Sequence, residues 1–124
     1  MHLVTYWNEK NRNGKRLSSA IKDVVPLNSL YVFHRIEDLS RGIHRIPWGS
    51  SIAVLLTSST KELSEIIALR GLFLERRIIL ILPDRKKESI SKGHTLFPRF
   101  LSYVDSDFRD VRVVLKKMIG GLTE

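Results

Sequence analysis

Two kinds of side chain in this sequence could do chemistry, and both follow apolar segments. Thr57-Ser58-Ser59-Thr60 supplies a run of hydroxyls directly after one apolar segment, at the start of an expected helix. Free backbone N–H groups and the helix dipole favour anions at such a place, so this stretch could hold a phosphate. Converging carboxylates could bind a metal ion or serve as acid and base. The carboxylates that follow expected strands are Glu9, Asp84, Asp105 and Asp107.

Structural roles account for most of these residues. Ser59 and Glu62 have the spacing of a capping box, in which each side chain accepts a backbone N–H at the helix start. Carboxylates are common in turns and caps, so we expect most of the acidic side chains to stabilise loops. The histidines show no ligand spacing and the chain has no cysteine, so we expect no metal ion, cofactor or disulfide. No serine stands near a suitable base, and we expect no catalysis.

The elements that would position these residues alternate between strand and helix. The segments 52–56 and 78–82 are unbroken apolar runs, which is typical of central strands in a parallel sheet buried on both faces. We expect three further strands over residues 2–7, 30–34 and 100–104.

Helices are expected between these strands. One-face spacing of apolar residues predicts a first helix that ends at Pro26, and a last helix from Phe108 that closes at Gly120-Gly121. The least periodic segment, 85–97, is expected to hold a short helix broken near Gly93.

Together these units predict one α/β domain over residues 1–124, a three-layer sandwich with a five-stranded parallel sheet. The expected fold is flavodoxin-like, with strand order 2-1-3-4-5. Ligands of such sheets bind where the strands end, which we call the carboxyl end of the sheet. The residues expected there are Trp7, Asn8, Glu9, Thr57, Ser58, Ser59, Pro83, Asp84, Asp105 and Ser106.

With this order of elements the chain resembles the receiver domain of two-component response regulators over nearly its whole length. The resemblance implies an acidic pair after strand one, a phosphate-accepting Asp after strand three, a hydroxyl after strand four and a Lys after strand five. This sequence has Asn8-Glu9, Thr57-Ser58, Pro83-Asp84 and Asp105-Ser106-Asp107 there. Thr and Ser cannot form an acyl phosphate, and one carboxylate is a poor anchor for Mg²⁺. We therefore expect a receiver-like domain without phosphotransfer.

The expected function is a non-catalytic signalling or protein-interaction module. The resemblance implies a partner surface on the last strand and helix, which could also serve self-association. Basic residues there would suit an acidic partner, namely Arg109, Arg112, Lys116 and Lys117.

The alternative is a sensor of a small anion or nucleotide at the carboxyl end of the sheet. It would use the basic loop around Lys15 and Arg16. The other candidate ligands are Asn8, Glu9, Thr57, Ser58, Ser59, Asp84 and Asp105.

Composition bears on the remaining partners. The 124 residues carry a formal net charge of +8, so nucleic acid is a further alternative. It is not favoured, because the basic residues are spread along the chain and most aromatics lie in apolar strand patterns. No apolar run approaches the roughly 20 residues of a membrane span, and the first residues lack a signal-peptide pattern. We expect no membrane association and a cytoplasmic location.

Overall fold

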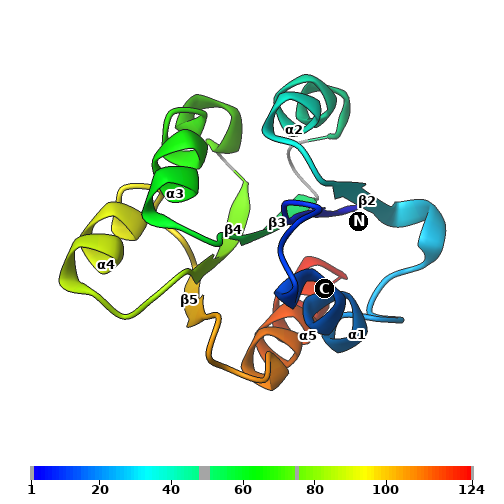
Figure 1. Cartoon of the computed structure of the whole chain (residues 1–124). Coiled ribbons are helices and arrows are strands. Elements are labelled where there is room, and N and C mark those ends of the chain that lie inside the picture. The colour runs from blue at the N-terminus through cyan, green and yellow to red at the C-terminus, as the bar shows by residue number, and fades with distance from the viewer. Residues whose placement is uncertain (1, 48–50, 75, 124) are drawn as a thin grey trace.

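The computed structural model describes residues 2–47, 51–74 and 76–123. Five strands form one sheet in which all neighbours run parallel, in the order β2-β1-β3-β4-β5 (Figure 1). This confirms the predicted α/β flavodoxin-like fold and its strand order. The strands are β1 (His2–Tyr6), β2 (Leu30–Phe33), β3 (Ser51–Leu56), β4 (Arg77–Leu82) and β5 (Phe100–Tyr103).

Helices cover both faces of this sheet. In Figure 1, α2, α3 and α4 lie on one side, and α1 and α5 lie on the other. The α-helices are α1 (Asn13–Ala20), α2 (Ile36–Gly42), α3 (Thr60–Ile67), α4 (Lys87–His94) and α5 (Arg109–Thr123). Short 3₁₀ turns are η1 (Leu27–Ser29), η2 (Ile43–Arg45) and η3 (Arg70–Phe73).

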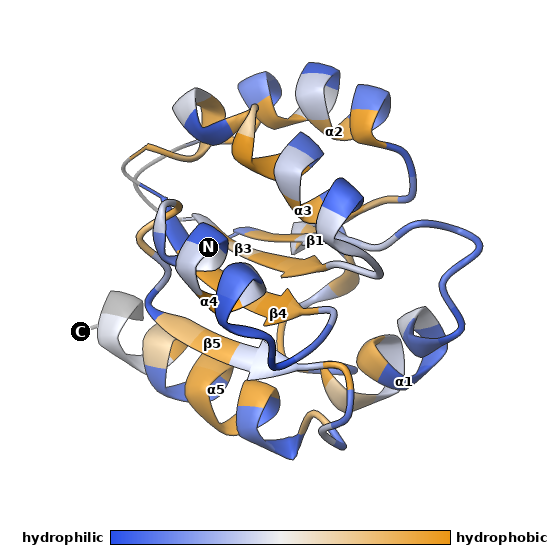
Figure 2. Ribbon diagram, turned by 60° about the vertical axis from the view of Figure 1, so that its left-hand side comes forward, coloured by the Kyte–Doolittle hydropathy of each residue, from blue (hydrophilic) through white to orange (hydrophobic). Residues whose placement is uncertain are grey.

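The central strands β3 and β4 are buried on both faces, as their unbroken apolar sequences predict. Leu55 and Leu80 belong to the core beneath α2, α3 and α4, whereas Val54 and Ile79 belong to the core beneath α1 and α5. Side chains alternate between the faces of a strand, so an apolar residue is needed at every position. Figure 2 shows these apolar strands between helices of mixed hydropathy.

Two helix ends differ from the predictions. The first helix ends at Ala20, well before Pro26, and the following turn contains Asp23 at φ 63°. Arg112 of α5 donates to the backbone carbonyls of Ala20 and Lys22 at 3.0 and 2.8 Å, so a contact remote in sequence satisfies this end. The last helix continues through Gly120-Gly121 to Thr123, because no described glycine adopts the positive φ that ends a helix.

The segment expected to hold a broken helix forms α4, and Gly93 lies inside it. A Cβ at Gly93 would lie 3.0 Å from Leu82 and 3.1 Å from Leu80, so glycine lets α4 pack closely on the sheet. The helix ends at His94, one residue after Gly93 and close to the predicted break, and Phe97 in the following loop has a φ of 51°.

Candidate functional site

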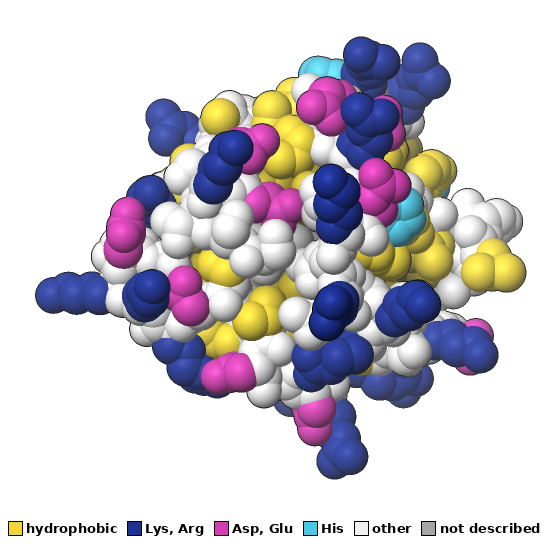
Figure 3. Space-filling view, viewed as in Figure 1, with side chains coloured by type: hydrophobic (Ala, Val, Ile, Leu, Met, Phe, Trp, Pro, Cys, Tyr) yellow, Lys and Arg dark blue, Asp and Glu magenta, His cyan; other side chains and the backbone are white. Residues whose placement is uncertain are grey.

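The carboxyl end of the sheet faces the viewer in Figure 3, where acidic side chains are interspersed with Lys and Arg. Thr57, one of the two candidates for the phosphate-accepting position, is buried there. Its hydroxyl donates to the carbonyl of Ile81 at 2.8 Å, and its backbone N–H donates to the same carbonyl at 3.1 Å. Both donors of Thr57 therefore fasten the end of β3 to β4.

At the start of α3 the Ser59 cap is present, but the reciprocal bond of the predicted capping box is displaced by one residue, from Ser59 to Ser58. The Ser59 hydroxyl accepts the backbone N–H of Glu62 at 3.1 Å. The Glu62 carboxylate accepts the backbone N–H of Ser58 at 2.7 Å and the Ser58 hydroxyl at 3.1 Å. A carboxylate thus already occupies the helix start, where the dipole and the free donors would otherwise attract an anion.

Glu62 also connects α3 to β1, which the sequence did not indicate. It is only 6% exposed, and its second carboxylate oxygen accepts the Tyr6 hydroxyl at 2.9 Å. Burial raises the pKa of the Tyr6 phenol far above its ordinary value, and the Glu62 hydrogen bond and charge raise it further. The phenol therefore stays protonated and serves as a donor within the fold.

Asn8 and Glu9 line a cavity of about 410 Å³ between β1, α2 and α3. The carboxylates of Glu37, Glu62 and Glu65 line it as well, and the cations there are Lys10 and Arg35. Asn8 accepts the backbone N–H of Lys10 at 2.9 Å and so stabilises a turn. The acidic lining disfavours an anion in this cavity.

The three other strand-end carboxylates, Asp84, Asp105 and Asp107, do not line that cavity, and Asp107 accepts the backbone N–H of Arg109 at 3.0 Å. Asp105 forms a bidentate pair with Arg85, both N···O distances being 2.9 Å, and this cation lowers the pKa of Asp105. The Arg85 guanidinium in turn lies 4.0 Å above the Tyr103 ring. Asp84 accepts the backbone N–H of Lys86 at 2.9 Å. The four predicted carboxylates therefore do not converge, and no cluster of His, Asp and Glu within residues 2–47, 51–74 and 76–123 could hold a metal ion.

Lys15 and Arg16 were expected in a basic loop, but both lie in the first turn of α1. Arg16 makes hydrogen bonds within the fold. Its guanidinium donates to the carbonyl of Val104 at 3.2 Å, to the carbonyl of Ser106 and to Asn13. It also lies 4.8 Å from the centre of the Phe108 ring. Arg16 therefore holds the loop after β5 against α1.

The segment that follows β1 lines a second cavity, of about 550 Å³. Its basic residues are Lys10, Arg12 and Lys15, and its acidic residue is Glu9. Trp7 forms part of its wall, and a Cβ at Gly14 would lie 2.2 Å from the indole, so only glycine allows this contact. This cavity contains Lys15 of the expected anion site, but its lining does not include Thr57, Ser58 or Ser59.

The predicted partner-contact residues on α5 divide into two groups. Arg112 is half-buried and caps α1, as described above. The other three, Arg109, Lys116 and Lys117, are exposed, and Arg109 lies 3.3 Å from Asp107. The structure thus leaves these three side chains available on the surface, and their role stays a prediction.

The opposite end, where the strands begin and which we call the amino end of the sheet, has features that sequence reasoning missed. A cavity of about 640 Å³ lies there between η3 and the loop that follows α4. Phe97 and Leu74 line it and are 85% and 63% exposed. The apolar runs Leu72-Phe73-Leu74 and Leu96-Phe97-Pro98 are signals in the sequence, but they do not indicate which side chains face solvent.

Beneath this cavity, the buried Arg76 guanidinium ties the amino end together. It donates to the carbonyls of Leu72, Ile43 and Ile46 at 3.1, 2.9 and 3.0 Å, and to the Ser51 hydroxyl at 2.9 Å. Burial lowers the pKa of Arg76 below its usual value. The backbone segments beneath the exposed apolar side chains are therefore joined by the hydrogen bonds of Arg76.

Comparisons with protein-family models, with curated proteins and with solved structures give no match for this chain. No helix in the part of the chain that the structure describes is both long and apolar enough to cross a membrane.

Proposed function

We propose that this protein is a non-catalytic, receiver-like module of signalling that acts by binding a protein partner. The observation that supports this most is Thr57. It follows β3, where receivers keep the acceptor aspartate, and its buried hydroxyl is hydrogen bonded to the Ile81 carbonyl at 2.8 Å. A hydroxyl cannot form an acyl phosphate, and this one is not presented to solvent.

The surrounding groups support the same proposal. Glu62, Asp105 and Arg16 all make hydrogen bonds within the fold, so the charged groups that follow the strands mainly stabilise it. Phosphoryl transfer needs positioned cations and carboxylates that face the phosphate. An interaction module needs only a stable surface, and the folded domain supplies one.

Intact-mass spectrometry after incubation with acetyl phosphate and Mg²⁺ tests the non-catalytic half. A receiver that retains its acceptor aspartate serves as the positive control in parallel. We expect the mass of this protein to stay unchanged while the control gains a phosphoryl group. Stoichiometric addition to this protein would contradict the proposal.

A second candidate function is binding of a small anion or nucleotide in the basic cavity beside Trp7. The observation that favours it is the combination of Lys10, Arg12 and Lys15 with an aromatic wall. Thermal-shift measurements with nucleotides and inorganic phosphate test it, because a ligand at 100 times its Kd stabilises a protein by about 2.7 kcal/mol. Lys15→Ala should abolish any shift if this cavity is the site, whereas the matched variant Lys61→Ala on α3 should leave it unchanged.

A further inference from the structure

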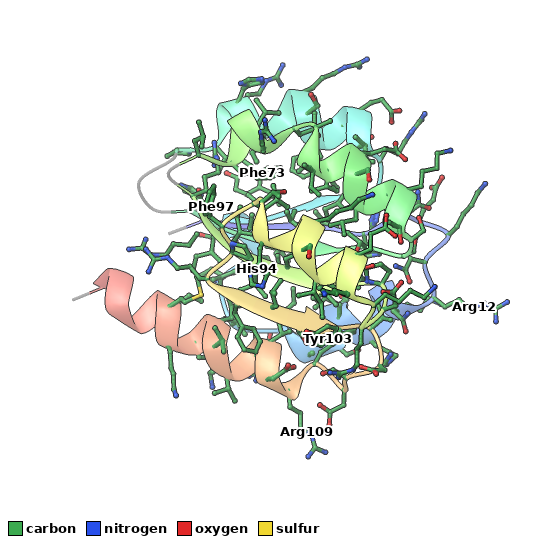
Figure 4. All side chains as sticks on the ribbon, turned by 90° about the vertical axis from the view of Figure 1, so that its left-hand side faces the viewer. Arg12, Phe73, His94, Phe97, Tyr103 and Arg109 are labelled. Atoms are coloured by element: carbon green, nitrogen blue, oxygen red, sulfur yellow. The ribbon has the colours of Figure 1, made fainter. Side chains whose placement is uncertain are left out.

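The cavity at the amino end of the sheet is bordered by side chains that the fold does not use. Phe97 is 85% exposed and Leu74 is 63% exposed, although both lie beside the buried Leu96 and Phe73. Figure 4 shows Phe97 and Phe73 at this end of the molecule, away from Arg12 at the carboxyl end. Two large apolar side chains over a hollow of about 640 Å³ are typical of an interface that receives a side chain from a partner.

The backbone at Phe97 is unfavourable for the residue that occupies it. Its φ of 51° lies in the left-handed region, where a side chain with a Cβ is disfavoured. Burial does not compensate for this conformation, because the ring is largely in water. A polar residue or glycine would suit the fold better, so stability does not explain Phe97.

The described residues that line the cavity carry charge of one sign. Arg70 and Arg76 are the charged residues among the described residues that line it, and Arg76 is bonded internally. Arg99 is exposed and follows Phe97 closely in the chain. The ion pairs found among the described residues involve Arg35, Arg85, Lys92 and Arg109, so neither Arg70 nor Arg99 pairs with a described carboxylate. Such a surface is complementary to carboxylates.

Other occupants fit less well. Single-stranded nucleic acid stacks successive bases on several aromatics, and Phe97 is the aromatic among the exposed large apolar side chains of the described residues. A second copy of this chain docked through the same surface would bring Arg70 and Arg99 of the two copies together, and like charges repel. A protein segment with carboxylates and an apolar anchor matches both the cavity and its charge.

We propose that the amino end of the sheet is a docking surface for an acidic protein segment. The segment inserts an apolar side chain beside Phe97 and Leu74 and places its carboxylates against Arg70 and Arg99. This inference rests on the proposed interaction function and names its surface and its kind of partner.

The test is selection of a random peptide library, displayed on phage, against the immobilised full chain. Enriched peptides are then synthesised with a fluorescent label, and their Kd is measured by anisotropy. We expect acidic peptides with aromatic or large aliphatic residues. Phe97→Ser should weaken their binding by about tenfold or more, whereas Val113→Ser, an exposed apolar residue on α5, should leave it unchanged.

Two double variants with the same change in net charge distinguish an effect of charge at the cavity from an effect of the overall charge. Arg70→Glu with Arg99→Glu, and Lys116→Glu with Lys117→Glu, each lower the formal net charge from +8 by 4. Only the first double variant should lose the peptides, by about tenfold or more. Circular dichroism and urea titration confirm that each variant is folded.

Each result decides the proposal. Loss of binding in the α5 variants alone would overturn the amino-end surface and leave the interaction function intact. Enrichment of peptides without acidic residues would overturn the acidic partner. Failure to enrich any peptide would count against both this surface and the interaction function. Binding of a labelled single-stranded oligonucleotide that Phe97→Ser abolishes would replace the protein partner with nucleic acid, and concentration-dependent dimerisation through Phe97 would replace it with a second copy.

Discussion

The two ends of the parallel sheet differ in how their side chains are used: polar groups at one end form hydrogen bonds, and apolar groups at the other are exposed. At the carboxyl end, polar groups that follow the strands bond to one another, as the Thr57 hydroxyl does to Ile81 and the Glu62 carboxylate to Tyr6. At the amino end, Phe97 and Leu74 stand in solvent above a cavity. Around the ends of β1 and β3, where related folds bind ligands, these polar groups are hydrogen bonded within the fold. The end that usually only supports the fold carries exposed apolar side chains.

A fold pattern by itself does not determine where a domain has a working site. A sheet of this order places strand-end residues together whatever their chemistry, so the arrangement alone does not imply catalysis. The residues that fill those positions decide it, and here they stabilise the domain.

The largest effect is expected at Arg76, the base of the amino-end surface. Arg76→Ala removes donors from three buried carbonyls and the Ser51 hydroxyl, and it should lower the free energy of unfolding by about 3 kcal/mol. Urea denaturation measures this. Arg77→Ala, the neighbouring half-buried arginine, should change stability by no more than about 0.5 kcal/mol. Equal losses in the two variants would show that Arg76 has no special role.

At the carboxyl end, Glu62→Ala should lower the free energy of unfolding by about 2 kcal/mol, because it deprives Tyr6 and Ser58 of their acceptor. The matched control is Glu65→Ala on the exposed side of the same helix, which should be nearly neutral. If Glu62→Ala also left the free energy of unfolding unchanged, these hydrogen bonds would not stabilise the carboxyl end.

Alkaline pH should weaken the carboxyl end through Tyr6. The pKa of Tyr6 is raised in the folded state, so the folded protein keeps a proton that the unfolded chain releases. The stabilisation is fully present below the ordinary tyrosine pKa of about 10 and is lost as pH rises toward the folded-state pKa. Tyr6→Phe should therefore show a shallower fall in stability above about pH 10. Urea titrations of both proteins across this range measure the difference, and parallel profiles would contradict it.

A smaller effect of opposite sign is expected at Phe97. Phe97→Gly should raise the free energy of unfolding by up to about 1 kcal/mol, since glycine tolerates a φ of 51° and little burial is lost. The same variant should lose the selected peptides. Leu74 has a φ of −59°, which most residues adopt without strain, so Leu74→Gly should slightly lower the free energy of unfolding. Destabilisation by Phe97→Gly would mean that the ring supports the fold after all.

The smallest effect concerns the exposed pair of Arg85 and Asp105. Arg85 lowers the pKa of Asp105, so the pair stabilises the folded state above the ordinary Asp pKa and this contribution is lost as pH falls. Arg85→Leu should return the Asp105 pKa toward its ordinary value, with little change in stability because both groups are exposed. A carbon-detected NMR titration of the carboxyl group measures this. An unchanged pKa would show that Arg85 does not hold Asp105.

The fold could be read from local signals. Unbroken apolar runs predicted β3 and β4, alternation of elements predicted a parallel sheet, and Ser59 with Glu62 predicted the start of α3. Helix ends were harder, because the end of α1 depends on Arg112, which is remote in the sequence.

The candidate sites were less predictable for the same reason. The Tyr6–Glu62 bond joins residues separated by 56 positions, and the exposure of Phe97 depends on how η3 and the loop after α4 pack together. Neither the Tyr6–Glu62 bond nor the exposure of Phe97 is marked by a sequence period or motif. Sequence therefore located the strand-end residues but did not show which of them bond within the fold.

We propose that this protein binds its partner through the amino end of the sheet and not through the carboxyl end. Chemical-shift mapping tests it most directly, with the ¹⁵N-labelled protein titrated with a selected acidic peptide. We predict that the largest shifts cluster at Arg70, Leu74, Thr95, Phe97 and Arg99. Shifts centred instead on Ser58, Asp84 and Asp105 would contradict the account.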